Sequence, residues 1–132
     1  PMADVTICKI DTAAQLVFGW ASVAVRKDGT VIVDYEGDLI DPVTLETAVY
    51  AFNLEFREAN EQHSGPVVGS LVESLVVTGE KLAAMGLPHD ALPQGWWAGF
   101  HIPNPVIFAK VVAGEYTMFS IEGTGYREEV VL

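Results

Sequence analysis

Residues 67–77 read Val-Val-Gly-Ser-Leu-Val-Glu-Ser-Leu-Val-Val and predict a long β-strand. Valine and leucine dominate this stretch, and such residues favour a pleated, half-buried backbone. In an alternating strand, Glu73 shares one side with Leu71, Leu75 and Val77. A carboxylate on such an apolar side needs a partner or solvent. Glu73 is therefore either an edge residue that faces water or a residue that orients a histidine ring.

The segments on both sides of this strand predict helices. Before it, Asp41 is a suitable N-cap and Pro42 suits the first helical position. Apolar residues then recur at helical spacing, and we expect this helix to end near Asn60. After the strand, residues 78–86 predict a short helix with Gly86 as its stop. The recurring apolar positions of the first helix are Leu45, Val49, Phe52 and Phe56.

Most of the remaining chain predicts further strands, separated by turns such as Asp28-Gly29. The expected strands are Val5–Ile10, Leu16–Val25, Val31–Tyr35, Trp96–Ile102, Val106–Val112 and Glu115–Ile121, with Tyr126–Leu132 either pairing or fraying. Consecutive strands with few helices indicate the α+β class. We predict a mostly antiparallel β-barrel of about seven strands with peripheral helices, forming one domain over residues 1–132.

Composition narrows the function classes. Half of the 132 residues are hydrophobic and 19% are charged, which suits a packed core. The formal net charge of −11 argues against nucleic acid and anionic membranes as partners. Cys8 is the single cysteine, so no intrachain disulfide is possible and a reducing compartment is expected. We interpret Pro1, which precedes Met2, as the remnant of a tag.

Two polar residues stand out as candidates for catalysis. His63 follows the first helix, in a loop that continues Ser64-Gly65-Pro66. Ser120 lies near a strand end just before Gly123, where backbone N–H groups could approach a reacting carbonyl as an oxyanion hole. The other histidines, His89 and His101, lack the spacing of a zinc site, so we expect no metal and no cofactor. Taken alone, His63 and Ser120 are more often ordinary surface or strand residues.

Five short blocks, in a fixed order along the chain, add a second line of inference. They are Phe18–Ala24, Asp34–Ile40 with Leu45–Ala48, His63 followed by Val72–Ser74, Leu92–Phe100, and Gly114–Gly123. Through these blocks the whole chain resembles the XkdF-like serine proteases of tailed phages, a branch of the prohead proteases that mature capsids. The segment Ser64-Gly65-Pro66 is looser than is usual beside a catalytic histidine.

The resemblance implies a fold similar to the herpesvirus assemblins, a β-barrel ringed by helices with histidine before serine in the chain. It implies a serine endopeptidase that cuts segments of scaffold and capsid proteins, and also itself, during procapsid maturation. The family's histidine corresponds to His63 and its serine to Ser120. The third member varies among relatives, and Glu73 of the Val-Glu-Ser block is our choice for it.

The resemblance also implies where and with what the protein works. Peptides of the scaffold and the major capsid protein are the expected substrates, and the portal and a second copy of the chain are expected partners. The expected location is the host bacterial cytoplasm, inside the procapsid. Proteases of this kind are often made with scaffold-like extensions, so we expect a C-terminal extension in the full gene product.

Two alternatives stay open from the sequence. The first is a catalytically silent assembly module of the same fold that binds scaffold or portal proteins, since fold does not dictate activity. The second is a β-barrel that binds a small molecule or lipid in a pocket lined by Trp20, Trp96 and Trp97. Tryptophans in such positions more often fill a core or an interface.

Overall fold

The computed structural model describes residues 3–25, 27–28, 42–55, 58–60, 67–115 and 118–121. The strands in these residues are β1 (Ala3–Asp11), β2 (Leu16–Val25), β3 (Glu58–Asn60), β4 (Val67–Val77), β5 (Gln94–His101) and β6 (Met118–Ile121). The helices are α1 (Pro42–Glu55), α2 (Gly79–Ala84) and α3 (Pro105–Val112). No helix among the described residues is long and apolar enough to span a membrane.

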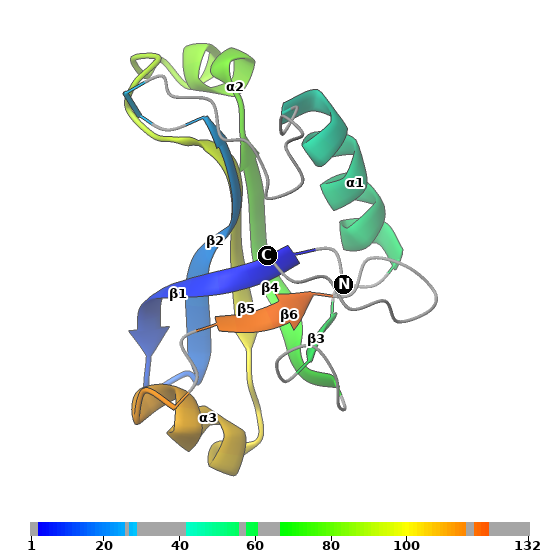
Figure 1. The fold of residues 1–132 in the computed structure, drawn as a ribbon, viewed down its shortest axis with the longest axis vertical. Helices are drawn as coiled ribbons and strands as arrows, with labels where there is room; N and C mark the ends of the chain where they lie inside the picture. The colour runs from blue at the N-terminus through cyan, green and yellow to red at the C-terminus, as the bar shows by residue number, and fades with distance from the viewer. Residues whose placement is uncertain are drawn as a thin grey trace.

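All strand pairs are antiparallel, and the strand order is β1-β2-β5-β4-β3-β6, with β6 pairing back onto β1. The four long strands β1, β2, β5 and β4 form the main sheet, and the short strands β3 and β6 link its two edges. Helix α1 lies along one side of the long strands, while α2 and α3 lie at opposite ends (Figure 1). The α+β class is confirmed. The six strands of the described residues close into a barrel, so the predicted barrel of seven strands is not what these residues show.

The segment Val106–Val112, which we predicted as a strand, forms helix α3. Asn104 caps this helix, because its side-chain oxygen accepts hydrogen bonds from the N–H groups of Val106 at 2.8 Å and Ile107 at 3.3 Å. Pro105 then occupies the first turn. Phe108 and Val111 are buried, three residues apart, as one helical face requires. The strand prediction was wrong because a short apolar run fits both periodicities, and the Asn-Pro cap decides between them.

The first helix is shorter than predicted. Its apolar positions Val49 and Phe52 are fully buried, as the spacing indicated. The helix ends at Glu55, however, and residues 58–60 form strand β3 instead of continuing the helix to Asn60. Strand β3 gains hydrogen-bonded partners on both sides, from β4 and β6, which a longer helix would forgo. Asp41, Phe56 and the predicted strands 31–35 and 126–132 lie outside the described residues.

The core lies between α1 and the facing side of the long strands. Trp96 of β5 is fully buried, and the Phe52 ring of α1 packs edge-on against it with centroids 5.4 Å apart. The Trp96 indole N–H donates a hydrogen bond to Ser74 Oγ at 2.9 Å, which satisfies its polar atom inside the core. Trp96 therefore fills the core, as tryptophans in such positions more often do.

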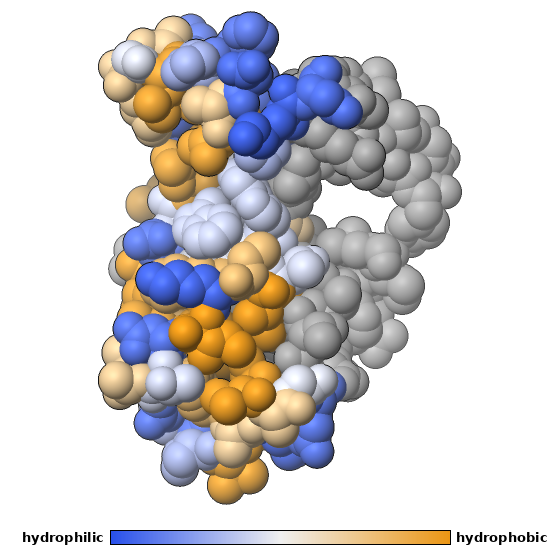
Figure 2. Space-filling view, turned by 90° about the vertical axis from the view of Figure 1, so that its left-hand side faces the viewer, coloured by the Kyte–Doolittle hydropathy of each residue, from blue (hydrophilic) through white to orange (hydrophobic). Residues whose placement is uncertain are grey.

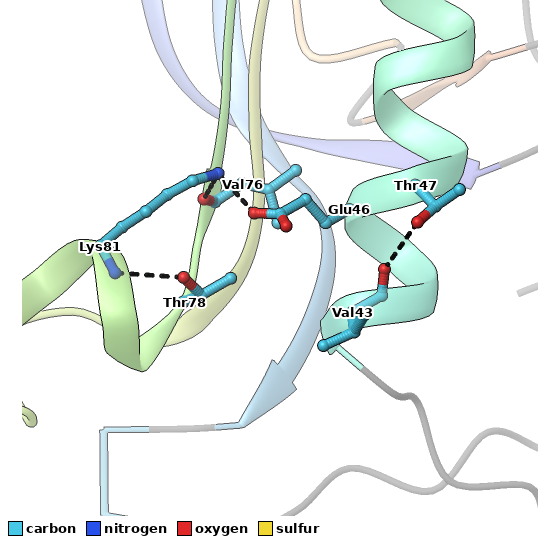
Figure 3. A network of polar contacts seen from close by, with 6 residues as sticks. All are labelled: Val43, Glu46, Thr47, Val76, Thr78 and Lys81. Carbon is cyan, nitrogen blue, oxygen red and sulfur yellow. Dashed lines mark hydrogen bonds and ion pairs between the residues drawn. The ribbon is translucent and has the colours of Figure 1, made fainter.

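An ion pair joins α1 to α2 at the upper end of the sheet (Figure 3). Lys81 Nζ lies 2.7 Å from Glu46 Oε2 and also donates a hydrogen bond to the Val76 carbonyl oxygen at 2.8 Å. Thr78 caps α2 by accepting a hydrogen bond from the Lys81 N–H at 3.2 Å. Gly86 follows the helix with φ +76°, which confirms the predicted glycine stop.

Candidate functional site

Ser120 lies on β6, within the segment predicted as the final strand. Its Cα partners are Asp4 on β1 and Asn60 on β3, so β6 runs between these two strands. Antiparallel partners have Cα atoms about 4.5–5.5 Å apart. The fold thus brings Ser120, near the C-terminus, beside the strand that ends at Asn60.

His63 lies outside the described residues. In the sequence it follows Asn60, the direct partner of Ser120, by three positions. Successive Cα atoms are about 3.8 Å apart, so the His63 Cα is at most about 11 Å from that of Asn60. The described pairing therefore places Ser120 next to β3, the strand that precedes His63 in the sequence.

Glu73 lies on the side of the sheet that faces away from the core. The β4–β5 register shifts between Leu71 and Glu73, so Leu71 pairs with buried Phe100 while Glu73 pairs with Gly99. This bulge inserts Val72 as an extra residue, so Leu71 and Glu73 point to opposite sides of the sheet instead of the same side. The prediction that Glu73 shares the side of Leu71 was wrong for this reason. The exposed Glu73 carboxylate accepts a hydrogen bond from the Trp97 indole N–H at 2.9 Å.

The strand register separates Glu73 from Ser120. On β4, the residue opposite Asn60 is Val67, and Asn60 is in turn opposite Ser120. Glu73 is six residues further along β4, which corresponds to about 20 Å at 3.3 Å per residue. The structure therefore does not bring Glu73 to Ser120. Its role as third catalytic residue stays an untested prediction, without support from the described geometry.

A second histidine–serine neighbourhood was not predicted. His101 on β5 is the direct partner of Ser70 on β4, and Ser70 is the partner of Glu58 on β3. Only the register of three strands reveals this row, because the residues are remote in sequence. His89 is exposed in the turn after α2. Among the described residues, no group of three or more histidine, cysteine or acidic residues is placed to hold a metal ion.

Three aromatic side chains gather on the outer side of the long strands, and we call Phe18, Trp20, Trp97 and the adjoining Glu73 the outer aromatic patch. The rings of Phe18 and Trp97 are stacked with centroids 6.5 Å apart, and Trp20 meets Trp97 edge-on at 5.5 Å. All three rings are partly exposed. Figure 2 views the molecule from the side away from α1, where hydrophobic surface lies among hydrophilic groups.

The patch joins several of the sequence blocks. Phe18 and Trp20 come from the first block, Glu73 from the third, and Trp97 from the fourth. Gly99 of the same block permits the close packing, because a Cβ there would lie 2.6 Å from Phe18 Cδ2. These blocks therefore meet through neighbouring strands, although they are far apart in the chain.

The chain matches a known protein family. A family model matches residues 4–129 of the 132-residue chain, and the class it defines is that of phage serine proteases. The chain belongs to the family described as "Putative phage serine protease XkdF". The membership predicted from the five blocks is thereby confirmed. Comparisons with curated proteins and with solved structures give no match.

Proposed function

We propose that this chain is a serine endopeptidase that cuts scaffold and capsid-protein segments during procapsid maturation. Ser120 is the nucleophile and His63 is its general base. The observation that carries the proposal is the pairing of Ser120 with Asn60, since it sets the serine beside the strand that precedes His63. Family membership over residues 4–129 supports the same chemistry. The assemblin-like barrel and the location inside the procapsid belong to this proposal.

The reaction follows the logic of acyl transfer. His63 takes the proton of the Ser120 hydroxyl as its oxygen attacks the peptide carbonyl, and then gives that proton to the departing amine. The C–N bond breaks and an ester forms on Ser120. Water, deprotonated by His63, then cleaves the ester and regenerates the hydroxyl. A carboxylate would stabilise the imidazolium form of His63, and two residues are candidates for this role. Asp4 is directly opposite Ser120 on the strand ladder, whereas Glu73 is about 20 Å along β4.

The test uses the scaffold and major capsid proteins as substrates. The purified chain is incubated with each, and the products are followed by mass spectrometry. Ser120→Ala and His63→Ala should each lower cleavage by a thousandfold or more. Ser70→Ala, which removes an exposed hydroxyl on β4, is the matched control and should keep the wild-type rate. Equal cleavage by wild type and Ser120→Ala would end the proposal.

A labelling experiment separates the protease from a silent assembly module. A serine-reactive phosphonate forms a covalent bond to an activated serine oxygen and should modify wild type at Ser120 stoichiometrically. His63→Ala should abolish this labelling, because the base is then missing. The chain would be the silent module if it binds scaffold or portal proteins but neither reacts with the phosphonate nor cuts these proteins, even after assembly.

A further inference from the structure

We propose that the outer face of helix α1 binds the same face of a second copy of this chain, in an antiparallel dimer. This inference is independent of the proposed protease activity. It starts from a row of exposed residues on α1 that we call the outer stripe, namely Val43, Thr47, Tyr50 and Leu54.

Helix α1 stands at the outside of the fold and has apolar residues on two opposite sides (Figure 1). One side packs on the sheet, where Val49 and Phe52 are fully buried. The outer stripe runs along the other side, because spacings of four, three and four residues keep it in line along a helix. The exposed fractions are 67% for Val43, 46% for Tyr50 and 76% for Leu54. Apolar residues on both sides are typical of a helix covered on both sides, whereas the described residues cover only the sheet side.

The polar groups of the outer stripe already have partners within the chain. The Thr47 hydroxyl donates a hydrogen bond to the Val43 carbonyl oxygen at 3.1 Å (Figure 3). Tyr50 is hydrogen-bonded to Glu46 and Lys81, and Lys81 Nζ lies 5.2 Å from the centroid of the Tyr50 ring. Covering the stripe therefore leaves no hydroxyl without a hydrogen bond, so the usual cost of burying polar groups is avoided.

The spacing of the outer stripe identifies a second copy as the occupant. Spacings of four, three and four read the same from either end, so a two-fold axis between Thr47 and Tyr50 superimposes the stripe on itself in the antiparallel direction. Each smaller side chain then meets a larger one. Val43 faces Leu54 of the second copy, and Thr47 faces Tyr50 of the second copy. Small side chains opposite large ones interdigitate, as close packing requires.

The charges of the chain favour the same arrangement. Each copy has a net charge of −11, so contact between two copies is favoured where the surface is uncharged, as it is along the outer stripe. The two-fold axis also brings the exposed Glu55 to the first turn of α1 in the second copy, near Thr44 of that copy. The first turn of α1 has no acidic residue of its own. A carboxylate is favourable there because the positive end of the helix dipole lies at the N-terminus.

The size of the contact sets the expected strength. Helix α1 has 14 residues and is therefore about 21 Å long. A contact between one helix and its copy is smaller than the interfaces of stable complexes, which bury about 1,600 Å². We therefore expect a weak dimer, with a Kd of about 10–100 µM.

The first arm of the test is sedimentation equilibrium of the whole chain at concentrations up to about 0.5 mM. Leu54→Glu places a charge in the outer stripe and should raise the Kd by about tenfold or more. Val112→Glu is the matched control, because Val112 is 52% exposed on α3, and it should stay within about twofold of wild type. Circular dichroism verifies that both variants are folded. A wild-type chain that stays monomeric, or a dimer that Leu54→Glu weakens no more than Val112→Glu does, would overturn the proposal.

The second arm tests the antiparallel pairing. Val43→Cys and Leu54→Cys are made separately in a Cys8→Ser background, because Cys8 is exposed and would also react. One variant carries a tag, so that the three possible products differ in mass. In a mixture, a short bismaleimide should join the two variants to each other about fivefold faster than it joins either variant to itself. Faster linkage of each variant to itself would indicate parallel helices and overturn the proposal.

A scaffold or capsid protein is the competing occupant of the outer stripe. Binding of these proteins to wild type, Leu54→Glu and Val112→Glu is measured by the same sedimentation method. We expect all three chains to bind them alike. If wild type is monomeric and Leu54→Glu alone loses this binding, the stripe belongs to that partner and the dimer is overturned.

Discussion

The indole N–H of Trp97 on β5 donates a hydrogen bond to the Glu73 carboxylate on β4, with 2.9 Å between nitrogen and oxygen. This contact gives Glu73 a partner that is not a histidine. It also fixes the carboxylate on the outer side of the sheet, about 20 Å along β4 from the level of Ser120. From the sequence alone, Glu73 could either orient a catalytic histidine ring or shape the surface of the sheet. Its hydrogen bond to Trp97 supports the second of these roles.

The first prediction follows for catalysis. Glu73→Gln should retain at least half of the wild-type kcat, because glutamine keeps an acceptor for Trp97 and the residue is far from Ser120. Asp4→Asn, directly opposite Ser120, should lower kcat more than Glu73→Gln does. The measurement is steady-state cleavage beside Ser120→Ala. A loss in Glu73→Gln that approaches the thousandfold loss of Ser120→Ala would return Glu73 to the catalytic set.

Features with a local sequence signal could be predicted, and two features without such a signal were missed. The strand Val67–Val77 is confirmed with its exact bounds, and the buried positions Val49 and Phe52 follow from helical spacing. Those signals are local. The helix at Val106–Val112 was missed because its apolar run fits two periodicities, and the bulge at Val72 was missed because one extra residue leaves no mark in an alternating pattern.

The candidate site depends on relationships that no local pattern carries. The pairing of Ser120 with Asn60 joins segments remote in the chain, and only strand order determines it. The sequence blocks nonetheless pointed to Ser120 and His63 through family resemblance. The same limit explains why the row of His101, Ser70 and Glu58 was not foreseen, since its members come from three strands.

The second prediction concerns Gly19, which faces the β1 backbone. A Cβ at this position would collide with the Thr6 carbonyl oxygen, which belongs to a paired strand and has little freedom to move. Gly19→Ala should therefore lower the free energy of unfolding by about 3 kcal/mol. Urea unfolding followed by tryptophan fluorescence measures this change.

Gly79→Ala is the matched control for that substitution. A Cβ at Gly79 would lie 3.8 Å from Gln94 Nε2, an ordinary contact, and the residue begins helix α2. Alanine favours a helix over glycine, so this variant should match wild type or gain up to about 1 kcal/mol. Equal destabilisation of the two variants would show that the β1–β2 contact is not as close as described.

The third prediction concerns the polar atom inside the core. Trp96 is fully buried, and Ser74 Oγ accepts its indole N–H at 2.9 Å. Ser74→Ala leaves this donor without its partner and should cost about 1–3 kcal/mol in the free energy of unfolding. Ser70→Ala on the same strand removes an exposed hydroxyl and should change it by less than about 0.5 kcal/mol. A neutral Ser74→Ala would mean that Trp96 finds another acceptor.

The fourth prediction is a pH dependence of the contact between α1 and α2. The hydrogen bond from Lys81 holds the pKa of Glu46 below its ordinary value of 4.5. Burial acts to lower the pKa of Lys81, but hydrogen bonds to Glu46 and Tyr50 outweigh it and raise that pKa above 10.5. A lowered carboxyl pKa stabilises the fold above pH 4.5, and this stabilisation is lost as the pH falls through the folded value. A raised ammonium pKa stabilises the fold below pH 10.5, and this stabilisation is lost as the pH rises through the folded value.

The pair should therefore contribute fully between about pH 5 and pH 10 and fade on either side. Urea midpoints of wild type and Glu46→Gln should differ within this window and converge as the pH falls below 4.5. In a Lys81→Met background the same substitution should no longer produce a pH-dependent difference, because the partner charge is gone. A difference that does not diminish as the pH falls below 4.5, or that stays pH-dependent in the Lys81→Met background, would show that Glu46 acts through other groups than Lys81.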